Sequence, residues 1–370
     1  MKQIVDVAAY IWPSYTGAEP RTRIFWPEGI GEWETVMRAQ PKFEGHAWPR
    51  KPLWGYQDEA DPSVMEMQIE QALSYGVNTF IYDWYWYDGR PFLEQCLNDG
   101  FLKAKNNEKM KFFIMWANHD ANYLWDRRNS SSDHRSTVIW QGKTTVRDFY
   151  TIGARWLDQY FTRPNYYKID GKPLISIYDL SNFVQTFGSP DATRTAMIWL
   201  DQKAKGYGLP GVHFQLIHQG ETTKNLSGID GPSASEELIT TLPFDSITSY
   251  QFCHMTDIDR TFSEAMPDVI TEWERLNRSF GIPYFPHVSI GWDNNARYTT
   301  LFRPRILKEN TPEVFEDAIR KAIAFAQENR SPMITVNSWN EWTEGSYLLP
   351  DDLHGYGYLE AVRNAVSDEK

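Results

Sequence analysis

Short apolar runs alternate with longer amphipathic stretches along most of the 370-residue chain. The short runs have the length and the β-branched or aromatic character of buried strands. Eight such strands are predicted: Val5–Tyr10, Thr79–Trp84, Phe112–Trp116, Pro173–Tyr178, Val212–Leu216, Ser246–Tyr250, Tyr284–Ser289 and Met333–Asn337. Strands that alternate with helical patterns form parallel sheets with crossover helices. Eight of them close most simply into an α/β fold, a single (β/α)8 TIM barrel.

Helical periodicity fills most of the intervals between these runs. The predicted helices are Val64–Tyr75, Phe92–Lys105, Thr145–Tyr160, Asp191–Lys205, Asp257–Phe280 and Thr311–Asn329. Ser63 is expected to cap the first of them, and Thr311–Pro312 fits an N-cap followed by proline at the first helical position. Between Gly220 and Leu242 the pattern predicts only a short helix, near Ser233–Thr240.

The alternative architecture is an open, doubly wound sheet. Such sheets bind nucleotides with a glycine-rich turn after the first strand, and none follows Val5–Tyr10 here. No repeat, low-complexity segment or linker divides the chain, so residues 1–370 are expected to form one catalytic barrel domain. Long loops at residues 10–62 and 118–143 are expected to shape a cleft at the C-terminal face of the strands.

Charge and cysteine content narrow the classes of partner. The formal net charge is −12 and no basic stripe is present, so nucleic acid is not an expected partner. No apolar run is long enough to span a membrane. No signal peptide precedes the first strand, which leaves a cytoplasmic protein or one whose export signal has been removed. Cys96 and Cys253 are expected to be buried small hydrophobic residues, with a disulfide left open, and the oligomeric state is open too.

Aromatic residues make up 15% of the chain, including 16 tryptophans. Many of the tryptophans lie in polar segments rich in glycine and proline, outside the periodic apolar runs. Flat aromatic rings stack on the C–H faces of sugars, so a tryptophan-rich cleft suggests a carbohydrate ligand. Padding of long loops is the structural alternative.

The active site of a (β/α)8 barrel lies at the C-terminal ends of its strands. Aromatic, amide and carboxylate side chains gather at the predicted strand ends, and twelve of them are expected to bind substrate: Tyr10, Trp12, Asp83, Trp84, Trp116, Asn118, Tyr178, Asp179, Tyr250, His287, Trp292 and Asn340. For Asp83 and Asp179 loop capping is an equal alternative, and a hydrogen-bonded structural role is one for His287. His218 and His254 share no metal-ligand spacing with nearby carboxylates, so neither a metal nor a cofactor is expected.

The segment after the last predicted strand carries the clearest catalytic pattern. It reads Asn337-Ser338-Trp339-Asn340-Glu341-Trp342-Thr343-Glu344-Gly345. A helical turn would place Glu341 and Glu344 on one face. Glycoside cleavage requires an acid for the leaving oxygen and a second carboxylate as nucleophile or base, with pKa values driven apart by their surroundings. An isolated pair of this spacing is common, but its place between two tryptophans at a strand end favours catalysis.

Five ordered segments match one known family. They are Gly31-Glu32-Trp33-Glu34, Gln68–Ala72 with Gly76–Phe80, Trp116-Ala117-Asn118, Gly291-Trp292-Asp293-Asn294 with Arg297, and Trp339–Gly345. The sequence resembles the WbsX-like proteins, which are related to glycoside hydrolase family 99. The resemblance covers most of the chain and implies a barrel enzyme that acts on carbohydrate.

The resemblance also implies roles for the two glutamates. Glu341 matches the residue proposed to deprotonate the substrate's own 2-hydroxyl, which then attacks the anomeric carbon and forms a 1,2-anhydro sugar. Glu344 matches the acid that protonates the leaving group and then activates water. The anomeric configuration is then retained without a glycosyl-enzyme bond. The run His119-Asp120-Ala121-Asn122 departs from the family's usual Glu and Trp–Arg cluster after W-A-N, so the family's action on α-mannosides is not transferred.

Other functional classes stay open beside a glycoside hydrolase. A glycosyltransferase is one, although no nucleotide-sugar fold or acidic metal motif is evident. A polysaccharide lyase would need a cationic clamp, and the predicted strand ends contain few Arg or Lys residues. A non-catalytic glycan-binding barrel would not require both glutamates. Asp293 and Arg297 are expected to form an ion pair that stabilises their loop.

Overall fold

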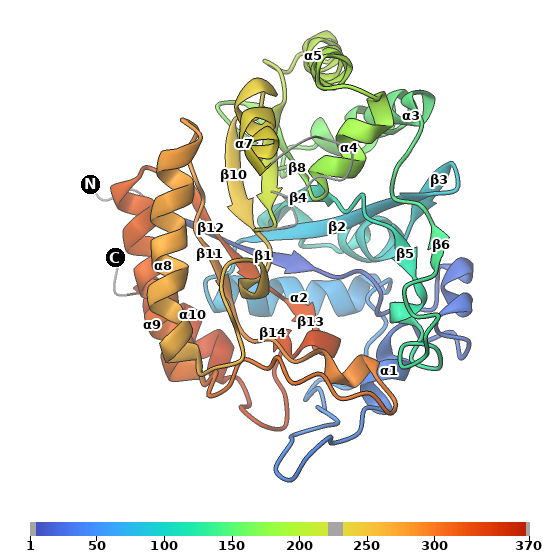
Figure 1. The fold of residues 1–370 in the computed structure, drawn as a ribbon, viewed down its shortest axis with the longest axis vertical. Helices are drawn as coiled ribbons and strands as arrows, with labels where there is room; N and C mark the ends of the chain where they lie inside the picture. Colours follow the sequence, from blue (N-terminus) through green and yellow to red (C-terminus); the bar gives the residue numbers. More distant parts are fainter. Residues whose placement is uncertain (1–4, 221–231, 368–370) are drawn as a thin grey trace.

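The computed structural model describes residues 5–220 and 232–367, and its centre is a ring of parallel strands (Figure 1). The eight barrel strands are β1 (Asp6–Ile11), β2 (Thr79–Tyr87), β4 (Lys111–Trp116), β8 (Lys172–Ile177), β9 (His213–His218), β10 (Ser246–Ser249), β11 (His287–Ser289) and β12 (Met333–Asn337). They are ordered β10-β9-β8-β4-β2-β1-β12-β11. Each predicted strand overlaps one of them, and the predicted (β/α)8 barrel is confirmed.

The ring closes between β10 and the segment that leads into β11. The Ile247 amide donates to the Pro283 carbonyl at 3.0 Å, and the Phe285 amide donates to the Ile247 carbonyl at 2.8 Å. These bonds form a parallel bridge between Ile247 and Tyr284. Closure by backbone hydrogen bonds leaves the barrel almost without a free sheet edge.

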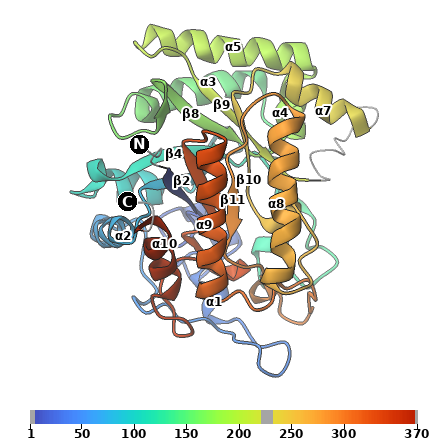
Figure 2. The same cartoon turned by 90° about the vertical axis from the view of Figure 1, so that its left-hand side faces the viewer.

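Helices surround the barrel on its outer side (Figures 1 and 2). They are α1 (Trp33–Met37), α2 (Pro62–Ser74), α3 (Val146–Trp156), α4 (Leu180–Phe187), α5 (Pro190–Gly206), α7 (Pro232–Thr241), α8 (Phe262–Ser279), α9 (Pro312–Glu328) and α10 (Gly357–Ser367). Figure 2 shows α8, α9 and α10 side by side along one flank. None of the helices in the described part of the chain has the length and apolar character needed to cross a bilayer.

The helix predicted at Phe92–Lys105 is wrong at its start. β2 runs on past the barrel to Tyr87 and turns back at Asp88-Gly89, where both residues have positive φ. This two-residue turn pairs β2 with β3 (Arg90–Phe92), as Asp-Gly turns do in hairpins. Only short helical turns follow, at Cys96–Gly100 and Phe101–Lys103.

Other helix boundaries differ because of local capping. The N-cap of α2 is Asp61, whose carboxylate accepts from the Ser63 amide at 2.8 Å, so the predicted cap at Ser63 is wrong. α8 begins later than predicted because Thr261 and Glu264 form a reciprocal capping box. The short helix near Ser233–Thr240 corresponds to α7, while the segment at residues 221–231 lies outside the described residues. Helices α1, α4 and α10 were not predicted.

Strand alternation decides which side chains reach the barrel interior. On β2, Trp84 faces the helix layer, where its ring lies 5.4 Å from that of Trp156. Trp116 on β4 faces the same way, with ring centroids 5.6 Å from Trp156 and 5.9 Å from Phe183. Both tryptophans therefore belong to the interface between strands and helices. Cys96 and Cys253 are both free thiols.

Replacing Trp116 by alanine is expected to destabilise the fold by about 3–5 kcal/mol, because it leaves a cavity in this aromatic layer. Urea unfolding followed by circular dichroism measures the loss. Ile198→Ala is the control, since Ile198 is 44% exposed on α5 and its truncation should cost well under 1 kcal/mol. Unchanged stability together with weakened glycan binding would instead place Trp116 in the binding site.

Candidate active site

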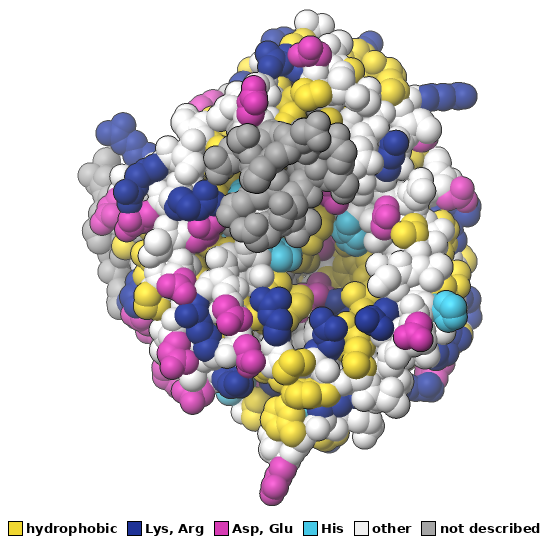
Figure 3. All heavy atoms as spheres, viewed as in Figure 1, with side chains coloured by type: hydrophobic (Ala, Val, Ile, Leu, Met, Phe, Trp, Pro, Cys, Tyr) yellow, Lys and Arg dark blue, Asp and Glu magenta, His cyan; other side chains and the backbone are white. Residues whose placement is uncertain are grey.

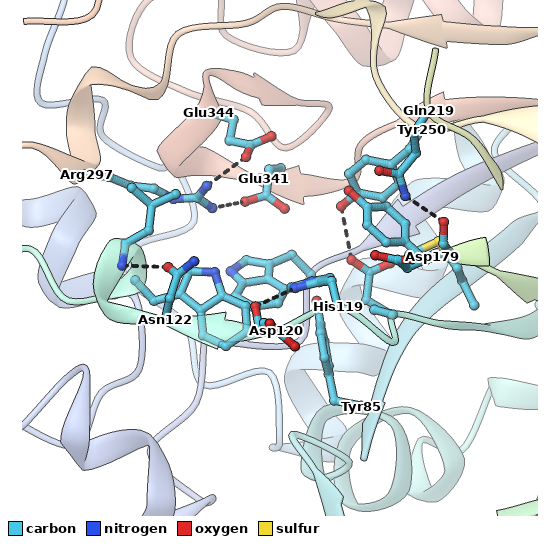
Figure 4. Close-up of a pocket in the computed structure, with 17 residues that line it drawn as sticks. Tyr85, His119, Asp120, Asn122, Asp179, Gln219, Tyr250, Arg297, Glu341 and Glu344 are labelled. Carbon is cyan, nitrogen blue, oxygen red and sulfur yellow. Dashed lines mark hydrogen bonds and ion pairs between the residues drawn. The ribbon is translucent and has the colours of Figure 1, made fainter. Parts of the chain in front are cut away.

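A polar cavity of about 360 Å³ opens at the C-terminal ends of the barrel strands. Figure 3 shows the hollow near the centre of this face, and Figure 4 shows the residues around it. All eight barrel strands or the loops that follow them contribute to its lining: Trp12, Asp83, Tyr85, Met115, Ala117, His119, Asp120, Asn122, Leu124, Trp125, Tyr178, Asp179, Gln219, Tyr250, Arg297, Glu341 and Glu344.

Glu341 and Glu344 are brought together by the short turn after β12. Glu341 ends the two-residue strand β13 (Asn340–Glu341), and a 3₁₀ turn carries Trp342–Glu344. One guanidinium holds both side chains: Arg297 donates from Nη2 to Glu341 Oε1 at 2.8 Å and from Nη1 to Glu344 Oε1 at 2.7 Å (Figure 4). The arginine fork thus fixes the spacing of the two carboxylates.

A third carboxylate completes this cluster. Glu32 Oε1 lies 3.4 Å from Arg297 Nε and accepts from the Thr343 hydroxyl at 3.1 Å. Its other oxygen accepts from the Trp12 indole. The preceding Gly31 has a φ of +65°, and a Cβ there would lie 1.8 Å from the Ser14 carbonyl. The tight approach that places Glu32 beside Arg297 therefore requires glycine at position 31.

The expected ion pair between Asp293 and Arg297 is wrong. Asp293 Oδ2 accepts from the Trp48 indole at 2.7 Å and lies 2.6 Å from His46 Nε2. The Arg297 side chain does not pair with Asp293 and instead lines the pocket. The prediction paired Asp293 with Arg297 because they are close in sequence. Three buried glutamates instead need a cation beside them, and Arg297 is the only Lys or Arg among the described residues that line the pocket.

The pKa values of Glu341 and Glu344 are both raised. Burial raises the pKa of Glu341 well above its usual range, and the Glu344 charge raises it further, while Arg297 opposes both. Burial also raises the pKa of Glu344. One guanidinium faces three carboxylates, so Glu341 and Glu344 titrate as a unit that retains a proton more readily than free carboxyls. Glu344 Oε2 is buried without a hydrogen-bond partner among the described residues, which fits a protonated oxygen.

Asp83 lies across the pocket from this pair. Its Oδ2 accepts from the Tyr250 hydroxyl at 3.0 Å, and its Oδ1 is buried without a partner in the described part of the chain. Burial raises the pKa of Asp83 well above normal, and Glu344 adds to the shift. Asp83 lines the polar pocket, and a carboxyl group with an unsatisfied oxygen there is suited to bind a sugar hydroxyl.

The far end of the pocket is built from loops after β4, β8 and β9. Burial lowers the pKa of His119, so its ring is neutral near pH 7. Asp179 caps α4 through the Asn182 amide at 2.8 Å and also lines the pocket, so both of its expected roles are compatible with the structure. Asp120 accepts from the Gly142 amide at 2.8 Å, and Gln219 donates to the Tyr178 carbonyl at 2.6 Å.

Aromatic rings form the remaining wall. Trp12 lies with its ring centroid 5.1 Å from Trp125 and 5.6 Å from Tyr85. The His119 ring lies 5.8 Å from that of Trp125. This wall presents flat faces beside the carboxylates, an arrangement that suits a sugar ring.

The structure brings some of the predicted substrate-binding residues together and not others. Trp12, Asp83, Tyr178, Asp179 and Tyr250 line the pocket with both glutamates. Seven predicted residues do not: Tyr10, Trp84, Trp116, Asn118, His287, Trp292 and Asn340.

Each of these exceptions has a structural reason. Trp84 and Trp116 face the helices, as described above. His287 lies inside the barrel, 2.9 Å from the Thr335 hydroxyl and 3.0 Å from that of Ser289. Tyr10 is also in the interior and donates to the Ser249 carbonyl at 3.2 Å. Trp292 is partly buried against the hydrophobic core. Side chains on a strand end reach the pocket only if the pleat points them inward and they stand above the interior layers.

Two asparagines support the pocket from behind. Asn118 accepts from the Asp179 amide at 2.7 Å and donates to its carbonyl at 2.8 Å. Asn340 accepts from the Trp12 amide at 2.8 Å and donates to the Trp12 carbonyl at 2.9 Å. Asn340 also donates to Glu59 Oε2 at 2.8 Å. These amides fix the backbone of two residues that line the pocket.

Sequence reasoning missed several polar and aromatic lining residues: Tyr85, His119, Asp120, Asn122, Trp125, Gln219 and Arg297. The two-residue period from Asp83 could have indicated Tyr85. The others lie on loops, where no periodicity reports direction. Within the described ranges 5–220 and 232–367, no three His, Cys, Asp or Glu side chains are grouped so that they could hold a metal ion.

The family described as "Glycosyltransferase WbsX" matches residues 7–362. The chain belongs to the WbsX family. Uncharacterized proteins WxcX from two strains of Xanthomonas campestris pv. campestris are 26% identical over 359 residues, 94% of this chain and 48% of theirs. The chain therefore spans about half the length of these curated relatives.

Solved structures similar to this WbsX-family barrel share its fold. A "Glycoside hydrolase-like protein" superposes with a TM-score of 0.62 at 15% identity, covering 98% of this chain and 94% of the other. The GH99 endo-alpha-mannosidase from Bacteroides thetaiotaomicron gives a TM-score of 0.60 at 15% identity, with 98% of each chain covered. At this identity the likeness shows the fold.

Arg297→Gln is expected to lower the free energy of unfolding by about 3–5 kcal/mol near neutral pH, because it leaves buried carboxylates uncompensated. Their folded-state pKa values then rise further above the unfolded values. Such groups stabilise the fold fully below the unfolded pKa of about 4.3 and lose that contribution as the pH rises. Denaturant unfolding at pH 5 and pH 8 should show the larger deficit at pH 8. An equal deficit at both values would contradict this charge pairing.

Glu59→Gln tests the carboxyl behind Asn340. Burial raises the pKa of Glu59 from 4.5 to about 7. Wild-type stability from this group is therefore present below about pH 4 and is lost as the pH rises through 7, whereas glutamine does not titrate. The free energy of unfolding of the variant minus that of wild type should therefore increase by about 3 kcal/mol from pH 4 to pH 8. Parallel stability curves would show that Glu59 is not perturbed.

Proposed function

We propose that this protein is a retaining glycoside hydrolase that cleaves a poly- or oligosaccharide with Glu341 and Glu344. The observation that carries the proposal is the carboxyl pair on the Arg297 fork, at the edge of an aromatic-walled pocket over the barrel strands. Supporting observations are the shared fold with glycoside hydrolase structures and the family resemblance of the Trp339–Gly345 segment.

In the proposed reaction Glu344 is the acid. Burial raises its pKa, which favours the protonated form that an acid requires, and this carboxyl is proposed to donate its proton to the leaving glycosidic oxygen. The Arg297 contact to Oε1 holds the carboxyl in place and stabilises the carboxylate that remains. Once ionised, the same group activates the incoming water.

Glu341 is the proposed base. It acts in its ionised form, which the Arg297 Nη2 contact to Oε1 stabilises against the burial that raises its pKa well above the usual range. Proton transfer from the substrate's 2-hydroxyl to Glu341 lets that oxygen attack the anomeric carbon as the leaving group departs. A 1,2-anhydro sugar forms. Water then attacks the anomeric carbon as Glu344 takes a proton from it, the C1–O2 bond breaks, and Glu341 returns its proton to O2. Because the pair shares Arg297, loss of the Glu344 proton is matched by gain of one at Glu341, so the net charge of the buried cluster does not change during the first step.

The aromatic wall and Asp83 are the proposed binding elements. Trp12 and Trp125 offer ring faces for stacking, and the free oxygen of Asp83 accepts from a sugar hydroxyl. Asp179, Tyr178 and Tyr250 complete the set of predicted residues that line the pocket. A glycosyltransferase is the second candidate, because the family carries that description.

The first experiment is product release from a panel of polysaccharides and oligosaccharides, with wild type beside the Glu341→Gln/Glu344→Gln double variant. A glycan cut by wild type alone supports hydrolysis, and its products identify the sugar and the endo or exo mode. If neither protein cuts any glycan and wild type transfers sugar from a nucleotide donor to an acceptor, the hydrolase proposal is wrong.

The two single variants separate the roles. Glu344→Gln should lose about 10²–10⁴-fold activity on unactivated glycosides but retain activity on aryl glycosides with good leaving groups, whose departure needs little protonation. Glu341→Gln should lose activity on both kinds of substrate while glycan binding, measured by calorimetry, is unchanged. Equal losses on both substrates for Glu344→Gln would remove its assignment as the acid.

A further inference from the structure

Four basic side chains gather on loops beside the pocket: Lys42, Arg127, Arg303 and Arg305, here called the basic rim. Figure 3 shows a row of Lys and Arg side chains along the lower edge of the hollow. Arg303 and Arg305 are exposed, and Lys42 and Arg127 are half-buried.

The loops that carry the basic rim are joined to one another. Lys42 Nζ donates to the Tyr298 and Thr299 carbonyls, both at 2.7 Å. The Ser131 hydroxyl oxygen accepts from the Thr299 amide at 2.9 Å. The rim is therefore one connected surface and not three independent loops.

The same loops are anchored to the pocket. Asn295, in the turn that carries Arg297, accepts from the Arg303 amide at 2.8 Å and donates to its carbonyl at 2.9 Å. Arg127 follows the lining residue Trp125 by two positions. The positive charge of Arg305 opposes the rise in the pKa of Cys253, a thiol that also senses Glu344. The rim thus lies within electrostatic range of the catalytic end of the pocket.

The rim cations have no acidic partners among the described residues. Neighbouring basic residues do: Arg260 pairs with Asp268, and Lys308 with Asp259 at 3.1 Å. In contrast, Arg127 Nε is buried without a hydrogen-bond partner, and the charge of Arg127, after burial, helps to lower the pKa of Lys42. Like charges that lack acidic partners repel one another, and an anion bound among them would relieve that repulsion.

The pocket lining is acidic, in contrast to the rim. Five acidic side chains line it, and the one arginine among its described lining residues is occupied by glutamates: Asp83, Asp120, Asp179, Glu341 and Glu344 are the acids, and Arg297 is the arginine. A carboxylate or phosphate on the sugar inside the pocket would meet repulsion, whereas the same group one or more sugar units along the chain would meet the rim.

We infer that the substrate is an acidic heteropolysaccharide, bound with an uncharged sugar in the pocket and an anionic group of a neighbouring unit on the basic rim. This inference rests on the proposed function and names its substrate class. A rim spread over three loops outside the pocket suits a polymer better than the compact diphosphate of a nucleotide sugar, which is the other source of an anion.

The experiment measures binding and cleavage separately. The probe is a polysaccharide in which neutral hexoses alternate with glucuronate, beside the same polymer after reduction of its carboxylates to alcohols. Wild type is compared with Arg303→Gln/Arg305→Gln and with the control Arg278→Gln/Arg363→Gln, which removes two arginines from the outer faces of α8 and α10. Affinity electrophoresis gives binding at 20 mM and 300 mM salt, and reducing-end release gives cleavage.

At low salt, wild type and control should bind the acidic polymer about tenfold more tightly than the reduced one, and high salt should remove most of the difference. Arg303→Gln/Arg305→Gln should bind both polymers alike. If wild type does not distinguish the polymers, or if a nucleotide sugar and not the reduced polymer displaces the acidic one, the inference is wrong. Rim-dependent binding without cleavage by any variant would contradict the proposed hydrolysis alone, and cleavage without rim dependence would contradict the substrate class alone.

Discussion

The site depends on one buried guanidinium that faces three carboxylates. Arg297 joins a loop near the N-terminus, the loop after β11 and the turn after β12, through Glu32, Glu341 and Glu344. Desolvating so many charges is costly, and only the geometry of the fork and the surrounding hydrogen bonds offset it. Burial raises the pKa of both Glu341 and Glu344, and the neighbouring negative charges add to the rise, so the same buried cluster sets both the architecture and the acidity of the site.

The barrel determines what the fork can face. Parallel strands deliver their C-terminal ends to one rim, which places Asp83 of β2 opposite the turn after β12 although 258 residues separate Asp83 from Glu341. The Asp88-Gly89 hairpin lengthens β2 beyond the barrel, and its aromatic residues extend the wall that Trp12 and Trp125 begin. Asn118 and Asn340 bind backbone groups behind this wall. Some polar residues therefore line the pocket, and others hold the lining residues in place.

Local pattern was sufficient to predict the strands, the barrel and the position of the glutamate pair, because apolar runs and the strand-end rule depend on short stretches of sequence. Local pattern did not predict the direction in which individual side chains point. Trp84 and Trp116 lie near strand ends as predicted, yet the pleat turns them to the helices. Arg297 was assigned to Asp293 because they are close in sequence, whereas its partners come from residues 32, 341 and 344. Such contacts depend on closure of the whole barrel, which no local window contains.

The family's description as a transferase and the fold it shares with glycoside hydrolases make the same demands on this pocket. Hydrolysis of a glycoside and transfer of a glycosyl group from a glycoside both need an acid at the leaving oxygen and a base at the attacking one, and both can retain configuration in two steps. They differ in which hydroxyl enters second, water or a sugar. In its proposed role Glu344 would deprotonate either hydroxyl, so both reactions use the same carboxyl pair. Whether water or a sugar attacks in the second step depends on what occupies the aromatic wall and the far end of the pocket near Asp179. A sugar bound there excludes water, and an empty site admits it.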